Sequence, residues 1–331
     1  MIISRTPLRI SFAGGGSDLP AFYQQETGAV VSTAINKYIY ITVNPKFDDK
    51  IRASYSRTEI VDRVDALKHE LIRKALKMVR IDKGIEITSI SDIPSQGTGL
   101  GSSSTYTVGL LNALYAYRNY FAGAERLARE ASMIEIEWCG KPIGKQDQYI
   151  AAYGGFQFIR FNPDGSVFVD PIVCAPETRE RLQEGLLMLY TGLVRKADNI
   201  LSEQSHNTRT DEEKRASLRR MVSLAEQMRE ALLRNDPGSF GEILHAGWME
   251  KRKLAQGITK PCIDEWYERA RAHGAIGGKI LGAGGGGFLL IYAPPECHPN
   301  ICEALPELRP VNFRFSPQGS KLIYVEENGY G

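Results

Sequence analysis

Apolar residues are dense and partly alternate with polar ones in several short segments, and this pattern is typical of strands. Toward the N-terminus these segments are 2–13, 29–44 and 84–91. A short helix is expected between the first two strands, because cap, first-turn and stop signals follow one another at Ser17, Asp18, Pro20 and Gly28. Apolar positions recur at helical spacing over 62–80, and further helices are expected from residue 104 onward and over about 124–139.

The pattern changes in the second half of the chain. Leu186–Thr191 is expected to form a strand, after which helical spacing dominates residues 194–273, with breaks at 235–238 and near 259–261. One more helix is expected near 296–305. Further strands are expected at Ile276–Leu281, Phe288–Tyr292, Val311–Phe315 and Lys321–Val325. Helices packed on an antiparallel sheet are therefore predicted for this half, and the fold class is α+β.

The chain has 331 residues, about twice the usual length of one domain, so two domains with separate cores are expected. We place the boundary at the change in pattern after Pro171 and Pro176, which gives domains over 1–180 and 181–331. Charged residues make up 24% of the chain and the formal net charge is only +2, so a nucleic-acid partner is not expected.

Cysteine usage and apolar runs bear on the compartment. The five cysteines are odd in number and form no CxxC pair, which argues against a disulfide framework and a structural zinc site. No apolar run approaches the roughly 18 residues of a membrane span, and the N-terminus lacks a signal-peptide pattern. A cytoplasmic protein without a membrane partner is expected.

The stretch PSQGTGLGSSS runs from a predicted strand into a predicted helix. Its alternating glycines let consecutive backbone N–H groups converge on an anion, and the helix that follows adds the positive end of its dipole. It lacks the lysine of a Walker A loop and the spacing of a dinucleotide fingerprint. We predict a phosphate-binding loop; the alternative is a flexible turn with a serine cap. Its candidate nucleotide-binding residues are Pro94, Gly97, Gly99, Leu100, Gly101, Ser102, Ser103 and Ser104.

Two other segments are rich in glycine. Gly282–Gly287 is followed by a predicted strand, so it is no Rossmann loop, and alone it could be a tight hairpin. Gly14–Asp18 can bring backbone close to a ligand and hold a carboxylate at the rim of a site, whereas the simpler reading is a helix cap.

In this order, the segments Pro7–Asp18, Pro94–Ser104 and Gly282–Gly287 resemble the three motifs of the GHMP kinase superfamily. The resemblance implies an N-terminal domain like the second domain of ribosomal protein S5 and a ferredoxin-like C-terminal domain. It also implies an ATP site between them and a phosphotransferase that acts on an alcohol group with Mg²⁺. The partners would then be small molecules only, and a homodimer stays open.

The stretch GKPIGKQDQ is similar to the galactokinase segment that holds the catalytic aspartate, so the resemblance implies that Asp147 is the base and that Arg9 lies beside it. By the same resemblance, Ser103 and Glu135 are the Mg²⁺ ligands. Glu137 lies on the other edge of the same apolar stripe, and helical spacing does not decide between the two glutamates.

The residues around these motifs look most like the heptose 7-phosphate kinase branch. Gly15 and Gly16 stand where galactokinase carries Glu and His, which makes galactose doubtful. The resemblance implies phosphorylation of the anomeric hydroxyl of D-glycero-D-manno-heptose 7-phosphate to the 1,7-bisphosphate. The alternatives are another GHMP sugar kinase, such as a fucose- or galactose-like one, and a sensor that binds ATP and sugar without turnover. The candidate substrate-binding residues are Gly15, Gly16, Ser17, Asp18, Lys145, Arg195, Gly284 and Gly285, with Lys145, Arg195 and Lys196 as candidates for the 7-phosphate.

Overall fold

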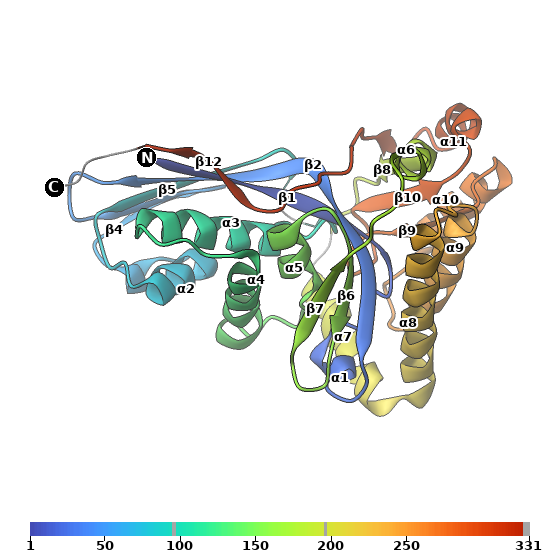
Figure 1. Ribbon diagram of the computed structural model, residues 1–331, viewed down its shortest axis with the longest axis horizontal. Helices are drawn as coiled ribbons and strands as arrows, with labels where there is room; N and C mark the ends of the chain where they lie inside the picture. The colour runs from blue at the N-terminus through green and yellow to red at the C-terminus, as the bar shows by residue number, and fades with distance from the viewer. Residues whose placement is uncertain (95–96, 195–196, 327–331) are drawn as a thin grey trace.

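A computed structural model describes residues 1–94, 97–194 and 197–326. Its larger sheet is built on two long antiparallel strands, β1 (Ile2–Ala13) and β2 (Gly28–Pro45), which cross much of the molecule (Figure 1). The sheet order is β12-β1-β2-β5-β3-β4, and β6 and β7 continue it from the N-terminal part of β2. The added strands are β3 (Ile51–Ser54), β4 (Thr58–Val61), β5 (Ile85–Ser91), β6 (Phe156–Phe161), β7 (Val167–Pro171) and β12 (Lys321–Val325).

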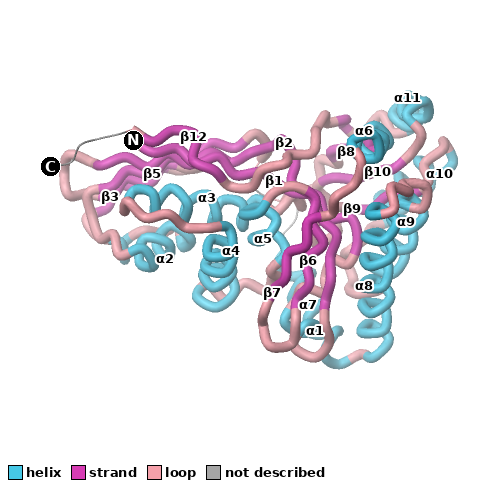
Figure 2. Tube along the Cα trace, in the orientation of Figure 1, coloured by secondary structure: helices cyan, strands magenta, loops and turns pink. Residues whose placement is uncertain are grey.

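Helices of the first half cover one face of this sheet (Figures 1 and 2). The helix α3 (Ser102–Tyr117) lies directly on β1 and β2 and is buried along most of its length, as expected from its apolar sequence. Around it lie α2 (Glu70–Val79), α4 (Ala124–Ser132), the π-helix η2 (Met133–Trp138) and α5 (Gln146–Tyr153). The short segments α1 (Pro20–Tyr23) and η1 (Val64–Ala66) complete this part.

The second sheet is antiparallel and has the order β11-β8-β10-β9. Its strands are β8 (Leu186–Tyr190), β9 (Gly277–Ile280), β10 (Phe288–Tyr292) and β11 (Arg309–Pro310). The helices of this half are α6 (Pro176–Gly185), α7 (Ala197–Thr210), α8 (Glu212–Leu233), α9 (Phe240–Lys251), α10 (Pro261–Ala272), η3 (Pro295–Cys297) and α11 (His298–Ala304). Of these, α9 packs on β9, and α8 packs on α9 and also reaches β1 and β2.

Two expectations for the C-terminal strands are wrong. Lys321–Val325 forms β12, but it pairs with β1 in the first sheet and not with the second. Val311–Phe315 is not a regular strand; only Arg309–Pro310 pairs with β8, and Phe315 makes an isolated bridge to Ile35. In both cases the pairing partner lies far away along the chain, and short-range periodicity carries no information about it.

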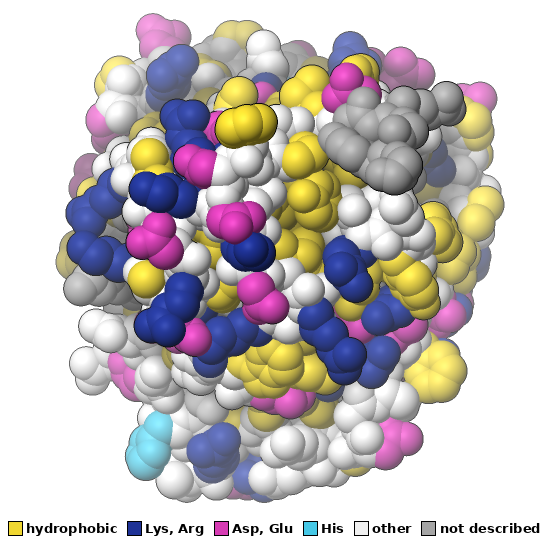
Figure 3. Space-filling model, turned by 90° about the vertical axis from the view of Figure 1, so that its left-hand side faces the viewer, with side chains coloured by type: hydrophobic (Ala, Val, Ile, Leu, Met, Phe, Trp, Pro, Cys, Tyr) yellow, Lys and Arg dark blue, Asp and Glu magenta, His cyan; other side chains and the backbone are white. Residues whose placement is uncertain are grey.

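No helix in the described ranges is long and apolar enough to cross a membrane. The end of the molecule that carries the N-terminus shows basic and acidic side chains interspersed over its surface (Figure 3), in keeping with the low net charge.

Candidate functional site

A pocket lies where the first motif loop, the start of α5 and the second half of the chain meet. The first half contributes residues from β1, from the loop after it and from the segment that leads into α5, and the second half contributes residues from α7, α9, β9 and the loop after β9. The lining comprises Arg9, Ser11, Gly15, Gly16, Asp18, Leu19, Ile143, Gly144, Gln146, Asp147, Leu201, Gln204, Lys251, Lys279, Gly282 and Ala283.

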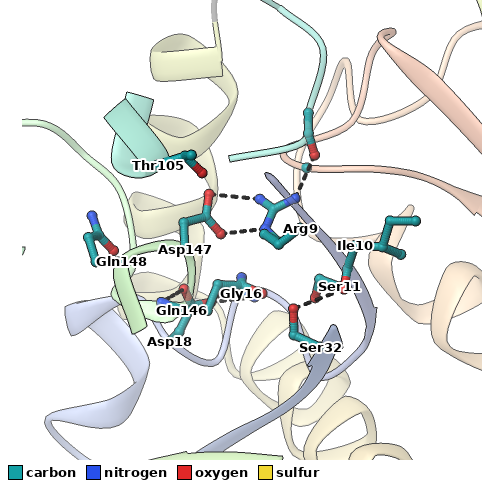
Figure 4. Close-up of polar contacts among 12 residues, drawn as sticks. Arg9, Ile10, Ser11, Gly16, Asp18, Ser32, Thr105, Gln146, Asp147 and Gln148 are labelled. Atoms are coloured by element: carbon teal, nitrogen blue, oxygen red, sulfur yellow. Dashed lines mark hydrogen bonds and ion pairs between the residues drawn. The ribbon is translucent and has the colours of Figure 1, made fainter. Parts of the chain in front are cut away.

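Arg9 and Asp147 form a two-point ion pair on one wall of this pocket (Figure 4). Arg9 Nε donates to Asp147 Oδ1 and Arg9 Nη2 donates to Asp147 Oδ2, each over 2.7 Å. The remaining fork nitrogen, Nη1, donates to the Gly99 carbonyl over 2.6 Å. A side chain at Gly101 would lie 3.2 Å from Asp147 Oδ2, so the glycine loop passes directly beside the carboxylate. The pair therefore joins the first motif to the second and holds the Asp147 carboxylate in one orientation.

Asp18 lies buried at the same pocket and accepts hydrogen bonds from three nitrogens (Figure 4). Its Oδ1 accepts from the Gly16 N–H at 2.9 Å and from Gln146 Nε2 at 3.0 Å, and its Oδ2 accepts from the Gln146 N–H at 3.2 Å. Burial, and after it the Asp147 carboxylate, raises the pKa of Asp18. Gly144 must be glycine, because a Cβ there would overlap the Asp18 carboxylate.

Ser17, by contrast, points into the protein. Its hydroxyl donates to the carbonyls of Gly14 and Ala29, and it accepts a hydrogen bond from the Ala29 N–H. These bonds tie the first motif loop to the start of β2, and Ser17 is not among the residues that line the pocket.

The predicted phosphate-binding loop ends at the N-terminus of α3. Gly97, Gly99 and Gly101 have φ values of 71°, 74° and 77°, the left-handed conformation that glycine adopts at little cost. Leu100 is buried, and its carbonyl accepts from the Arg9 N–H at 3.1 Å. Side chains at Gly99 or Gly287 would overlap the backbone of the partner segment, at Leu281 and Thr98 respectively. The second and third glycine segments are thus packed backbone to backbone, beside the unpaired N–H groups of a 16-residue helix.

The three serines after this loop differ in environment, and the loop begins at an exposed proline. Ser102 is buried and its hydroxyl lies 3.3 Å from Thr98 Oγ1, while Ser104 is buried as well. Ser103 is exposed, and its hydroxyl donates to Glu135 Oε1 at 2.5 Å. Pro94 is exposed, and it is the last described residue before the gap at 95–96.

Glu135, in the π-helix η2, lies beside Ser103, in the first turn of α3. Glu135 is fully buried, and its second oxygen accepts from Gln148 Nε2 at 2.6 Å. Burial raises the pKa of Glu135, against the effect of these hydrogen bonds. Glu137 is exposed and makes no hydrogen bond or ion pair among the described residues; burial, then Asp18 and last Glu137, raise the pKa of Tyr23. A hydroxyl and a carboxylate beside a phosphate-binding loop are the kind of oxygen ligands that Mg²⁺ uses together with substrate phosphates.

Other predicted substrate residues lie at the edge of the pocket or outside it. Lys145 is half-buried, donates to the Gly165 carbonyl at 3.1 Å and lies over the Tyr23 ring; it does not line the pocket, and burial lowers its pKa. Gly284 and Gly285 pack against Ile258, and their neighbours Gly282 and Ala283 line the pocket instead. Arg195 and Lys196 lie outside the described residues.

Sequence reasoning missed several polar residues of the lining, namely Ser11, Gln146, Gln204, Lys251 and Lys279. The clearest is Lys279, whose ammonium donates to the carbonyls of Ser11 and Phe12 at 2.9 Å and 3.1 Å. Burial, and after it Arg9, lowers the pKa of Lys279 to about 7. One signal was available: a lysine inside the otherwise apolar and glycine-rich strand β9 needs a special reason to be buried.

Comparisons with known proteins agree with this geometry. Residues 66–155 match the model of the GHMP kinases N terminal domain, and residues 228–308 match that of the GHMP kinases C terminal domain. The chain is 30% identical, over 97% of its length and 98% of the relative's, to a D-glycero-alpha-D-manno-heptose 7-phosphate kinase of Campylobacter jejuni. It is 26% identical over 87% of its length to a bifunctional fucokinase/GDP-fucose pyrophosphorylase of Arabidopsis thaliana, of which it covers 29%. A solved D-glycero-D-manno-heptose 1-phosphate kinase of Bacteroides thetaiotaomicron superposes with a TM-score of 0.81, at 26% identity, over 99% of this chain and 100% of that one.

Proposed function

Because this chain belongs to the GHMP kinase family, and is therefore an ATP-dependent phosphotransferase with a hydroxyl acceptor, we propose that its acceptor is a heptose phosphate. The finer proposal is transfer to the anomeric hydroxyl of D-glycero-D-manno-heptose 7-phosphate, giving the 1,7-bisphosphate. The GHMP kinase fold expected from the three motifs is confirmed. The observation that carries the reaction chemistry is the Arg9–Asp147 pair beside the glycine loop.

The nucleotide would bind with its phosphates at the loop over 97–104. Backbone N–H groups there and the N-terminal end of α3 would neutralise part of the phosphate charge, and this needs no side-chain cation. The packing of Gly99 against Leu281 and of Gly287 against Thr98 fixes the shape of the loop before ATP arrives.

Mg²⁺ would be held by Ser103 and Glu135 together with phosphate oxygens. The pair fits such an ion, because both ligands are oxygens, they already touch, and Gln148 orients the carboxylate from its other side. When bound, the ion would neutralise charge on the transferred phosphoryl group. Glu135 must be ionised to bind it, and the nearby positive charge would favour the ionised form against burial.

Asp147 would orient the acceptor hydroxyl and take its proton. In the transfer, the acceptor oxygen forms a bond to the γ-phosphorus, the bond from that phosphorus to the β–γ bridging oxygen breaks, and ADP leaves. Arg9 holds Asp147 in place, and its guanidinium would stabilise the charge that develops on the phosphoryl group. Asp18, backed by Gln146, would accept hydrogen bonds from other hydroxyls of the sugar.

The test is ADP formation from ATP and a panel of acceptors, with the product identified by ³¹P and ¹H NMR. The panel contains heptose 7-phosphate, heptose 1-phosphate, the free heptose, fucose and galactose. We expect the highest kcat/KM with heptose 7-phosphate, and coupling of the new phosphorus to the anomeric proton. Faster use of heptose 1-phosphate would indicate that the phosphoryl group goes to a hydroxyl at the other end of the sugar. Faster use of fucose would favour a fucose-like kinase. Binding without ADP formation from any acceptor would favour a sensor.

A further inference from the structure

One wall of the pocket consists of hydrogen-bond donors from the second half of the chain. Lys251 ends α9, Lys279 lies in β9 and Gln204 lies in α7, and all three line the same pocket as Arg9 and Asp147. Their side chains are only 5%, 3% and 2% exposed. The carboxylates of Asp18 and Asp147 line the same pocket from the first half of the chain, so the pocket combines acidic groups from one half with these donors from the other.

The charge on Lys279 has only neutral partners in the described structure. Its ammonium donates to two main-chain carbonyls, and the charged residue that most affects it is another cation, Arg9. Lys251 reaches the same pocket, and its ammonium donates to the Gly282 carbonyl. A buried cation that lies near another cation, as Lys279 lies near Arg9, is costly unless an anion joins it. The wall is therefore suited to a ligand that brings negative charge.

Gln204 supplies a donor that nothing in the described residues satisfies. Its Nε2 is buried without a hydrogen-bond partner, and so is the Oγ of Ser11, which lines the same pocket. A Cβ at Gly16 would overlap this amide nitrogen, so the first motif loop carries glycine where the amide must fit. An unpaired buried donor is costly, and a ligand oxygen in the pocket would recover that cost.

We propose that Lys279, Lys251 and Gln204 bind the phosphate monoester that the acceptor sugar already carries. This inference rests on the proposed function and names the site for the acceptor's own phosphate. A phosphate monoester has three acceptor oxygens and close to two negative charges, which match a wall of two ammonium groups and an amide. The carboxylates of Asp18 and Asp147 would repel that phosphate and accept from hydroxyls, so the sugar would enter with a hydroxyl toward Asp147 and its phosphate toward the lysines.

The test compares binding of heptose 7-phosphate with binding of the free heptose, by calorimetry without ATP, in the wild type and in two variants. Lys279→Met removes a charge at similar volume, and Gln204→Glu replaces the donor by an anion of the same shape. We expect both variants to bind heptose 7-phosphate at least about tenfold more weakly, with little change for the free heptose. Lys253→Met is the control for loss of a lysine charge, because Lys253 is exposed, pairs with Glu250 and follows the end of α9 outside the pocket lining.

Each outcome decides a separate point. If the wild type binds both sugars equally, the proposed acceptor and this inference both fall. If the wild type prefers the phosphate form and both variants keep that preference, the inference alone is overturned. In a kinetic assay of the same variants, a drop in kcat that is equal for both sugars, or a raised KM for ATP, would assign the wall to the transferred phosphoryl group instead. Thermal melting checks the fold, and Gln204→Leu, which removes the amide donor without adding a charge, replaces any variant that does not fold.

Discussion

At the scale of single residues, the role proposed for Asp147 is the most direct to test. Asp147→Asn should lower kcat at least about a hundredfold, because the amide cannot take the acceptor proton and loses one charge-assisted bond to Arg9. The Kd for ATP should stay close to the wild-type value, since the carboxylate acts on the acceptor. Asp170→Asn is the control, because Asp170 is a partly exposed aspartate on β7 that pairs with Arg160 on β6. A kcat within threefold of wild type would remove Asp147 from the mechanism.

The two glutamates of η2 form a matched pair for the metal site. Glu135→Gln should raise the Mg²⁺ concentration needed for half-maximal rate, because an ionised oxygen beside Ser103 is lost. Ser103→Ala should have a smaller effect in the same direction. Glu137→Gln should leave the Mg²⁺ dependence unchanged, since Glu137 is exposed and it is Glu135 that contacts Ser103. A larger defect in Glu137→Gln would mean that the ligand is assigned to the wrong glutamate.

Lys279 should leave a signature in the pH dependence of stability. Its pKa is about 7 in the folded protein and near 10.5 in the unfolded chain. Between these values the unfolded state binds more protons, so the free energy of unfolding should rise with pH across that window. Urea unfolding at pH 7 and pH 9 should show the wild type gaining about 2 kcal/mol more than Lys279→Met between the two pH values. Parallel pH profiles would show that Lys279 is charged in the folded state throughout.

At the scale of elements, the contact between the second and third glycine segments can be separated from the cost of the backbone conformation. Gly99 and Gly84 both have positive φ, at 74° and 70°, but only at Gly99 would a Cβ overlap another segment, at Leu281. Gly99→Ala should therefore weaken ATP binding about tenfold or more and lower Tm further than Gly84→Ala does. Equal effects in the two variants, measured by calorimetry and thermal melting, would show that the loops do not depend on this contact.

The sequence was most informative about elements whose patterns are local. The long strands β1 and β2, the strand β5 and the helix α3 follow from alternation, apolar spacing and glycine punctuation. It could not choose between Glu135 and Glu137, because regular helical spacing treats both alike, whereas the π-helix at Met133–Trp138 changes the rotation per residue there. Gln204 was out of reach for another reason, because it becomes a pocket residue only through packing between distant segments. The lysine within β9 was a signal of a buried charge, but the sequence does not show which groups it faces.

At the scale of the whole molecule, the N-terminal sheet depends on a strand from near the C-terminus. Residues Ile2–Arg5 of β1 pair on one side with β2 and on the other with β12. A chain that stops after Ser320 would leave this edge of β1 unpaired, so we expect Tm to fall by several degrees and dimers or larger aggregates to form. Melting and size-exclusion chromatography check this against a chain that stops after Glu326, which keeps β12. An unchanged Tm would show that β12 adds nothing to the sheet.

The overlap that a side chain at Gly16 would make with Gln204 constrains how such a site can change over evolutionary time. A lineage that acquires a larger residue at position 16 first would have to displace a buried amide, and the intermediate would be impaired. If Gln204 shortens first, the overlap is removed and only the cost of the positive φ of 105° at Gly16 opposes a larger residue. The order of the two substitutions therefore matters, and a transplant of the first motif from a relative with another sugar preference should succeed only when position 204 is changed with it.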